Sequence, residues 1–159
     1  MSSEKRKIAY IDGKPYEIGA NHTSILKFVK SYVGEKKVPT LCDDPNLAPY
    51  GACRVCSVEV ALEKDGPTRM VASCHTPVAE NQHIFTSNEA ITSLRKNIVE
   101  LVLTDHTMEC DSCEVNNNCE LQTVANDLGI SDHRYNSPKQ HKGIPRDTSH
   151  DYMRMNLDN

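Results

Sequence analysis

The chain has 159 residues, 38% of them hydrophobic and 5% aromatic, which is enough for one domain or two small ones around a lean core. Its formal net charge of −4 argues against a nucleic-acid-binding protein. The first residues lack the apolar stretch of a signal peptide and no apolar run reaches membrane length, so we expect a cytoplasmic protein without direct membrane insertion. Seven cysteines in such a chain favour metal binding over disulfides.

The first part of the chain alternates strand and helix signals with turns. Asp12-Gly13 is a strong β-hairpin signal. Thr23 or Ser24 can cap a helix that ends at Gly34. The hairpin, the helix and the strands that follow predict a β-grasp domain around a cysteine loop. The predicted elements are strands at residues 7–10, 15–18, 57–61, 69–72 and 83–86 and a helix over residues 25–33.

Four cysteines of this part form the first candidate site. Cys42, Cys53 and Cys56 lie in one loop, and Cys74 follows after a gap of seventeen residues. A C-x-x-C pair with one cysteine upstream and one well downstream is the ligand pattern of a plant-type 2Fe–2S centre. Gly51 suits such a loop because it tolerates unusual backbone angles and lets N–H groups approach the sulfurs. Zinc is an alternative, because zinc ribbons and fingers also use C-x-x-C pairs.

Beyond the strands the hydrophobic period changes to that of a helix. Apolar residues recur at helical spacing from Ile91 to Val102. The polar last part of the chain has no clear period and predicts an extended tail, either disordered or laid on a partner. We expect helices from residue 87 or 88 to 104–106 and over residues 119–128, and three domains at residues 1–87, 88–130 and 131–159.

A second constellation of ligand types lies between these helices: His106, Cys110, Cys113 and Cys119. Sulfur-rich sites select zinc or iron–sulfur clusters. Four ligands in so short a stretch can wrap a 4Fe–4S centre, with one ligand for each iron. Neutral imidazole in place of a thiolate would raise the potential of that centre, as histidine does in Rieske centres. Taken alone, His106 could instead be a helix-end histidine that interacts with the helix dipole.

The two motifs, C-x10-C-x2-C-x17-C and H-x3-C-x2-C-x5-C, together resemble the N-terminal iron–sulfur region of one superfamily. It includes the large iron–sulfur subunit of NADH:quinone oxidoreductase, iron-only hydrogenases and the alpha subunit of NAD-dependent formate dehydrogenases. The strings PYGACRVCSVEV, VASC, TSNEA and NNNCELQ extend the resemblance over about residues 7–159. It implies an α+β chain, with a ferredoxin-like β-grasp domain followed by a helical segment. The implied ligands are Cys42, Cys53, Cys56 and Cys74 for a 2Fe–2S cluster and His106, Cys110, Cys113 and Cys119 for a 4Fe–4S cluster.

The resemblance also implies a role as an electron-transfer module or subunit. Such a module relays single electrons between a flavin- and NAD(H)-binding subunit and a catalytic subunit of a redox complex. No nicotinamide, flavin or phosphate-binding motif and no Ser–His–Asp arrangement can be argued, so no catalytic residue is assigned. In the relatives a stretch like DTSHDYMRMNLDN leads into a further cluster domain, so the chain is either a separate subunit or the front end of a larger one. The alternative function is that of a zinc-stabilised structural adaptor.

Overall fold

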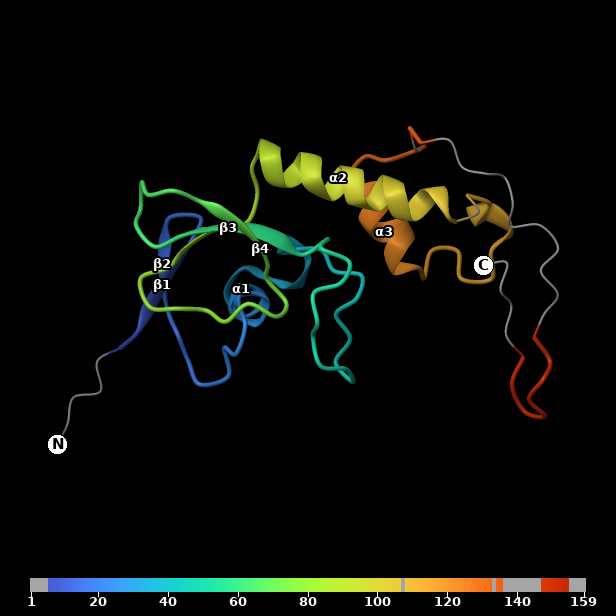
Figure 1. Ribbon diagram of the computed structural model, residues 1–159, viewed down its shortest axis with the longest axis horizontal. Coiled ribbons are helices and arrows are strands. Elements are labelled where there is room, and N and C mark those ends of the chain that lie inside the picture. Colours follow the sequence, from blue (N-terminus) through green and yellow to red (C-terminus); the bar gives the residue numbers. More distant parts are fainter. Residues whose placement is uncertain (1–5, 107, 133, 136–146, 155–159) are drawn as a thin grey trace. The chain divides into compact units, whose positions relative to one another are not determined.

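The computed structural model describes residues 6–106, 108–132, 134–135 and 147–154 (Figure 1). The chain forms two compact units, Met1–Arg95 and Lys96–Asn159, and the division falls within helix α2. The strands are β1 (Ile8–Ile11), β2 (Lys14–Glu17), β3 (Ser57–Ala61), β4 (Arg69–Ala72) and β5 (His83–Phe85). The helices are α1 (Ile25–Val33), α2 (Glu89–Thr104) and α3 (Glu120–Asp127), with short 3-10 helices η1 (Glu35–Lys37) and η2 (Cys110–Ser112).

The first hairpin is tighter than the sequence predicts. Asp12 has a φ of 47° and Gly13 a φ of 82°, so both turn residues are left-handed, which suits a two-residue hairpin turn. Both strands therefore reach the turn, and Ile11 pairs with Lys14. Each strand lies one residue nearer the turn than the predicted ranges 7–10 and 15–18. β2 contains Pro15 and is an edge strand, where the missing N–H is tolerated.

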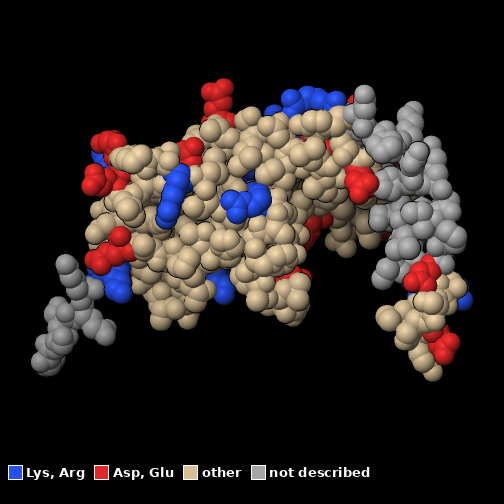
Figure 2. Space-filling view, in the orientation of Figure 1, with Lys and Arg blue, Asp and Glu red and all other residues tan. Residues whose placement is uncertain are grey.

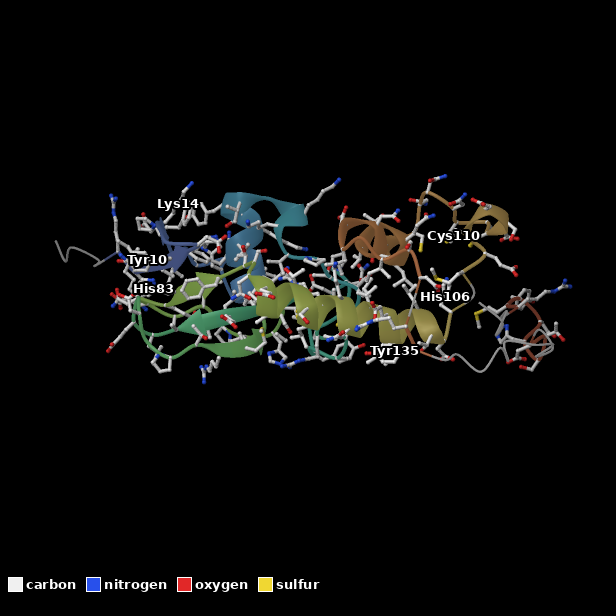
Figure 3. All side chains as sticks on the ribbon, turned by 90° about the horizontal axis from the view of Figure 1, so that it is seen from above. Tyr10, Lys14, His83, His106, Cys110 and Tyr135 are labelled. Atoms are coloured by element: carbon white, nitrogen blue, oxygen red, sulfur yellow. The ribbon has the colours of Figure 1, made fainter. Side chains whose placement is uncertain are left out.

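The five strands form one mixed sheet in the order β2-β1-β5-β3-β4. β1 and β5 are parallel, and the other neighbours are antiparallel. The rings of Tyr10 and His83, which face each other across the parallel pair, stack with their centroids 4.3 Å apart (Figure 3). This mixed sheet with its helices confirms the α+β class.

Helix α1 packs its apolar residues against the sheet and closes the core of the first unit (Figure 1). The Oγ of Ser24 accepts a hydrogen bond from the N–H of Lys27 at 3.3 Å, so the cap is Ser24 rather than Thr23. Gly34 ends the helix with a φ of 98° and donates its N–H to the carbonyl of Lys30. Cys56 and Cys74 belong to the same core, and each is 1% exposed.

The second unit is helical in its described part. Cys119 caps α3, and Gly129 follows the helix with a φ of 67°. Beyond α3, Arg134 pairs with Glu100 of α2 at 2.7 Å, so the chain is held to its own unit as far as this residue. Most of the predicted tail, at residues 136–146 and 155–159, lies outside the described residues.

Two features of the surface bear on function. No helix in the described part of the chain is long and apolar enough to cross a membrane. On the face drawn in Figure 2, acidic and basic side chains are interspersed. That face therefore lacks the basic stripe that is typical of nucleic-acid-binding proteins.

Candidate metal centres

The β3–β4 hairpin and the loop before it position the first group of cysteines. Cys56 immediately precedes β3 and Cys74 lies two residues after β4, and the pairing of Ser57 with Ala72 brings these strand ends together. Ser73 closes the arrangement, because its Oγ donates a hydrogen bond to the carbonyl of Cys56 at 2.7 Å. Buried hydrogen bonds of this kind fix the backbone on both sides of the two sulfurs.

The four thiols of this group act on one another in two pairs. Burial, together with the neighbouring thiol Cys56, raises the pKa of Cys74 to about 12. Burial also raises the pKa of Cys42, which exchanges a hydrogen bond with the thiol of Cys53. Burial would raise the pKa of Cys53 as well, but hydrogen bonds from backbone N–H groups such as that of Val55 and from the Cys42 thiol lower it. The structure thus brings all four predicted residues together, as Cys42 with Cys53 and Cys56 with Cys74.

This donor set fits a two-iron centre. All seven cysteines of the chain are free. In a 2Fe–2S centre with four cysteine ligands each iron takes two thiolates, which corresponds to two adjacent pairs. Structural zinc instead requires four ligands that converge on one ion. Among the described residues, no group of three or more His, Cys, Asp or Glu side chains is placed to hold a single ion.

Two left-handed residues shape the loop that carries Cys53 and Cys56. Gly51 has a φ of 70°, and a Cβ atom there would lie 2.5 Å from Cδ2 of His75, so the imidazole packs directly on the glycine backbone. Arg54 has a φ of 62°, and its carbonyl accepts hydrogen bonds from the N–H and Oγ of Ser57 at 3.1 and 2.6 Å. Arg54 therefore contributes a backbone turn to this site, while the residue itself is exposed.

The loop is also tied to helix α1 by an ion pair that the sequence did not suggest. Nζ of Lys30 lies 3.6 Å from the carboxylate of Asp43, the residue after Cys42, and 3.2 Å from that of Glu35. Lys30 is in the last turn of α1, so one side chain joins the helix end to the start of the cysteine loop. Helical periodicity could place Lys30 on the polar face of α1 but could not identify its partner in the loop.

The second group lies on the segment between α2 and α3, where His106 and Cys110 are labelled in Figure 3. His106 follows the helix end, and its N–H donates to the carbonyl of Leu103 at 3.2 Å. Cys110 begins η2, and the N–H of Cys113 donates to its carbonyl at 3.1 Å. The structure keeps His106, Cys110, Cys113 and Cys119 on one local segment, but it does not draw three of them around a single point among the described residues.

Gln122 organises the loop between Cys113 and Cys119, a role that the sequence pattern did not reveal. Its N–H donates to the Cys119 sulfur at 3.5 Å, and its side chain bonds Asn116 at 2.9 Å and the N–H of Asn117 at 2.8 Å. A signal for this role exists in the sequence. Gln122 lies three residues after the helix cap, where a capping box places Glu or Gln.

Two family models match the chain. Residues 8–89 match a 2Fe-2S iron-sulfur cluster binding domain. Residues 95–134 match the NADH-ubiquinone oxidoreductase-G iron-sulfur binding region, a 4Fe-4S model. The models confirm the predicted cofactors, a 2Fe–2S and a 4Fe–4S cluster, while the individual ligand residues remain predictions.

Curated relatives resemble the chain over a small part of their own length. It is 34% identical over 137 residues to NADPH-Fe(3+) oxidoreductase subunit alpha of Geobacter sulfurreducens, which covers 86% of this chain and 15% of that protein. It is 34% identical over 133 residues to a subunit of the NADH-quinone oxidoreductase of Escherichia coli K12, which covers 82% of this chain and 14% of that protein.

A solved structure shares the fold. It is an NAD+-reducing NiFe hydrogenase in the H2-reduced state, with a TM-score of 0.73 and 24% identity over 91% of this chain and 57% of that chain. The family resemblance read from the two cysteine motifs is confirmed by these matches. The chain belongs to the family of 2Fe–2S iron–sulfur cluster binding domains, continued by an iron–sulfur binding region of the NADH-ubiquinone oxidoreductase-G type.

Proposed function

We propose that the chain is an electron-transfer module that carries two iron–sulfur clusters. When bound, such clusters supply one-electron redox chemistry, and the protein supplies ligation, spacing and burial. The proposed ligands are Cys42, Cys53, Cys56 and Cys74 for the 2Fe–2S cluster and His106, Cys110, Cys113 and Cys119 for the 4Fe–4S cluster.

The observation that carries the proposal is the pairing of four free thiols at one end of the sheet. Cys42 interacts with Cys53 and Cys56 with Cys74. Cys56 and Cys74 lie in the hydrophobic core, so the protein keeps water from that side of the site. Exclusion of water and hydrogen bonds to sulfur are the means by which a protein tunes the potential of such a centre.

The second centre is supported by its sequence context and by local structure. His106 stands at the end of α2, and Cys119 caps α3, so the two helices hold the outer ligands. The thiol of Cys119 at a helix N-terminus is in a place that favours the thiolate form. Cys110 and Cys113 occupy the short connection between the helices, which leaves all four side chains on one stretch of chain.

The matched relatives are named as subunits, which supports a role inside a larger assembly. We propose a flavin- and NAD(H)-binding subunit and a separate catalytic subunit as partners. The assembly would be of the NADH dehydrogenase, hydrogenase or formate dehydrogenase type and would be cytoplasmic. Within the chain, residues 1–87 and 88–130 would carry one cluster each, and residues 131–159 would make contact with a partner.

Iron and sulfide analysis of anaerobically purified protein tests the proposal. We expect about six irons and six acid-labile sulfides per chain, the sum of the two cluster types. Dithionite should produce the electron paramagnetic resonance signal of a reduced 2Fe–2S centre, which Cys53→Ser should remove while the 4Fe–4S signal persists. Stoichiometric zinc without sulfide would contradict the proposal and favour a zinc-stabilised adaptor.

A further inference from the structure

Arg95 is a buried cation without a carboxylate partner. It lies on α2 and is 5% exposed. One of its terminal nitrogens donates a hydrogen bond to the carbonyl of Ser57 at 2.8 Å. Its Nε is buried and has no hydrogen-bond partner among the described residues. Within that part of the chain no carboxylate lies in ion-pair distance of Arg95 either, although a buried guanidinium normally requires compensation.

The nearest candidate for that compensation is the first cysteine group. Ser57, which accepts the hydrogen bond from Arg95, is the residue directly after Cys56. Burial lowers the pKa of Arg95 to about 10, and the negative charge of Cys56 acts in the opposite direction. Arg95 therefore stays protonated at neutral pH and interacts electrostatically with Cys56, which is itself 1% exposed.

We propose that Arg95 is a positioning residue for redox function, whose buried positive charge beside Cys56 stabilises the reduced form of the 2Fe–2S centre and so raises its midpoint potential. This inference rests on the proposed ligand set. A low-potential chemical reductant adds one electron and no proton to the centre, so the negative charge at the four thiolates increases by one. A fixed positive charge in a poorly screened interior favours that change, because Coulomb interactions are strong at low dielectric.

The hydrogen bond to Ser57 gives Arg95 a second function that the experiment must separate from the first. It joins α2 to the start of β3 at the Cys56 turn, so Arg95 also stabilises the fold. A role limited to this contact would change stability but would leave the potential of an intact centre unaltered. The potential is therefore the informative readout.

The test is a redox titration with dithionite and mediators, followed by the electron paramagnetic resonance signal of the 2Fe–2S centre in the full chain. Arg95→Gln removes the charge and keeps polar groups, and we expect its reduction equilibrium to fall by about tenfold, which is 59 mV for a one-electron couple. Arg95→Lys keeps a positive charge and should stay close to the wild type. Arg69→Gln is the matched control, because Arg69 is exposed at the other end of the β3–β4 hairpin from Cys56, and its potential should not change.

Each outcome decides a different claim. If wild-type protein has no 2Fe–2S signal, the proposed ligand set fails. If the signal is present and Arg95→Gln has the wild-type potential, the inference about Arg95 fails while the ligand set stands. If Arg95→Gln cannot hold the cluster but Arg95→Lys can, the positive charge is required for the site and the inference is supported. If both variants lose the cluster, the role of Arg95 is structural and the inference is overturned.

Discussion

The contact between Gly51 and His75 allows a quantitative test of how the first cysteine loop is built. Gly51→Ala has two costs. The left-handed backbone, with its φ of 70°, costs an L-residue roughly 1–2 kcal/mol. The new Cβ would lie 2.5 Å from Cδ2 and 2.9 Å from Nε2 of His75, and overfilling a packed site costs roughly 1–3 kcal/mol. Because His75 is exposed, its ring can turn away, so we expect a total near the low end, about 2–3 kcal/mol.

Two further variants separate these costs. Gly13 has a φ of 82° and nothing within 4 Å of an added Cβ, so Gly13→Ala should cost only the backbone strain, roughly 1–2 kcal/mol. The double variant Gly51→Ala/His75→Ala removes the overlap and keeps the strain. Its stability should therefore return to that of Gly13→Ala, once the effect of His75→Ala alone is subtracted in a double-mutant cycle.

The assay is the rate at which the visible absorbance of the cluster-loaded protein bleaches at a fixed temperature without oxygen. If opening of the first unit limits cluster loss, each 1.4 kcal/mol corresponds to about a tenfold change in rate. Gly51→Ala should then bleach about 30-fold faster than wild type and Gly13→Ala about tenfold faster. Equal rates for Gly51→Ala with and without His75→Ala would refute the packing argument.

Three further predictions concern the second centre, pH and the tail. His106→Cys should keep a 4Fe–4S cluster at a lower midpoint potential, because a charged thiolate replaces imidazole; a redox titration checks this, and an unchanged potential would place the fourth ligand elsewhere. Cluster-free protein should lose stability as pH rises from 9.0 towards about 12, because burial raises the pKa of Cys74 in the folded state and the unfolded chain loses its proton first; guanidinium unfolding above pH 9.0 measures this, and a flat profile would contradict it. Removal of residues 138–159 should leave both cluster spectra intact, because Arg134 and its pairing with Glu100 are retained, while co-purification of partner subunits weakens; loss of either spectrum would disprove this.

The elements of the fold that depend on local chemistry are predictable from sequence. Asp12-Gly13 specifies a hairpin because both residues tolerate the left-handed angles that its turn requires. The sequence predicts that helix α2 begins at residue 87 or 88, and the side chain of Asn88 does accept a hydrogen bond from the N–H of Ile91 at 2.8 Å. Its end, predicted at residues 104–106, falls at Thr104. Each of these signals lies within a few residues of the structure that it specifies.

Contacts between distant residues are not predictable in the same way. The parallel pairing of β1 with β5 is stabilised by Asp12, whose carboxylate accepts hydrogen bonds from the N–H and Oγ of Thr86 at 2.8 and 2.6 Å. These residues are 74 positions apart, and the sequence pattern identifies Asp12 only as a turn residue. Arg95 presents the same difficulty, because helical periodicity cannot show that one cation on α2 is buried at the Cys56 turn. Chemistry that depends on such contacts becomes visible only in three dimensions.

The two centres should differ in how much they contribute to folding. In the first unit, Cys56 and Cys74 belong to a hydrophobic core that a sheet and helix α1 already form, so a cluster there completes an existing structure. In the described part of the second unit, the buried apolar side chains are few: Val99, Leu103, Val124, Ala125 and Ile130. A core this small supplies little hydrophobic stabilisation, and in such domains metal binding supplies much of the folding free energy. We therefore infer that the second unit depends on its cluster more strongly than the first, even though its ligands are closer together in the sequence.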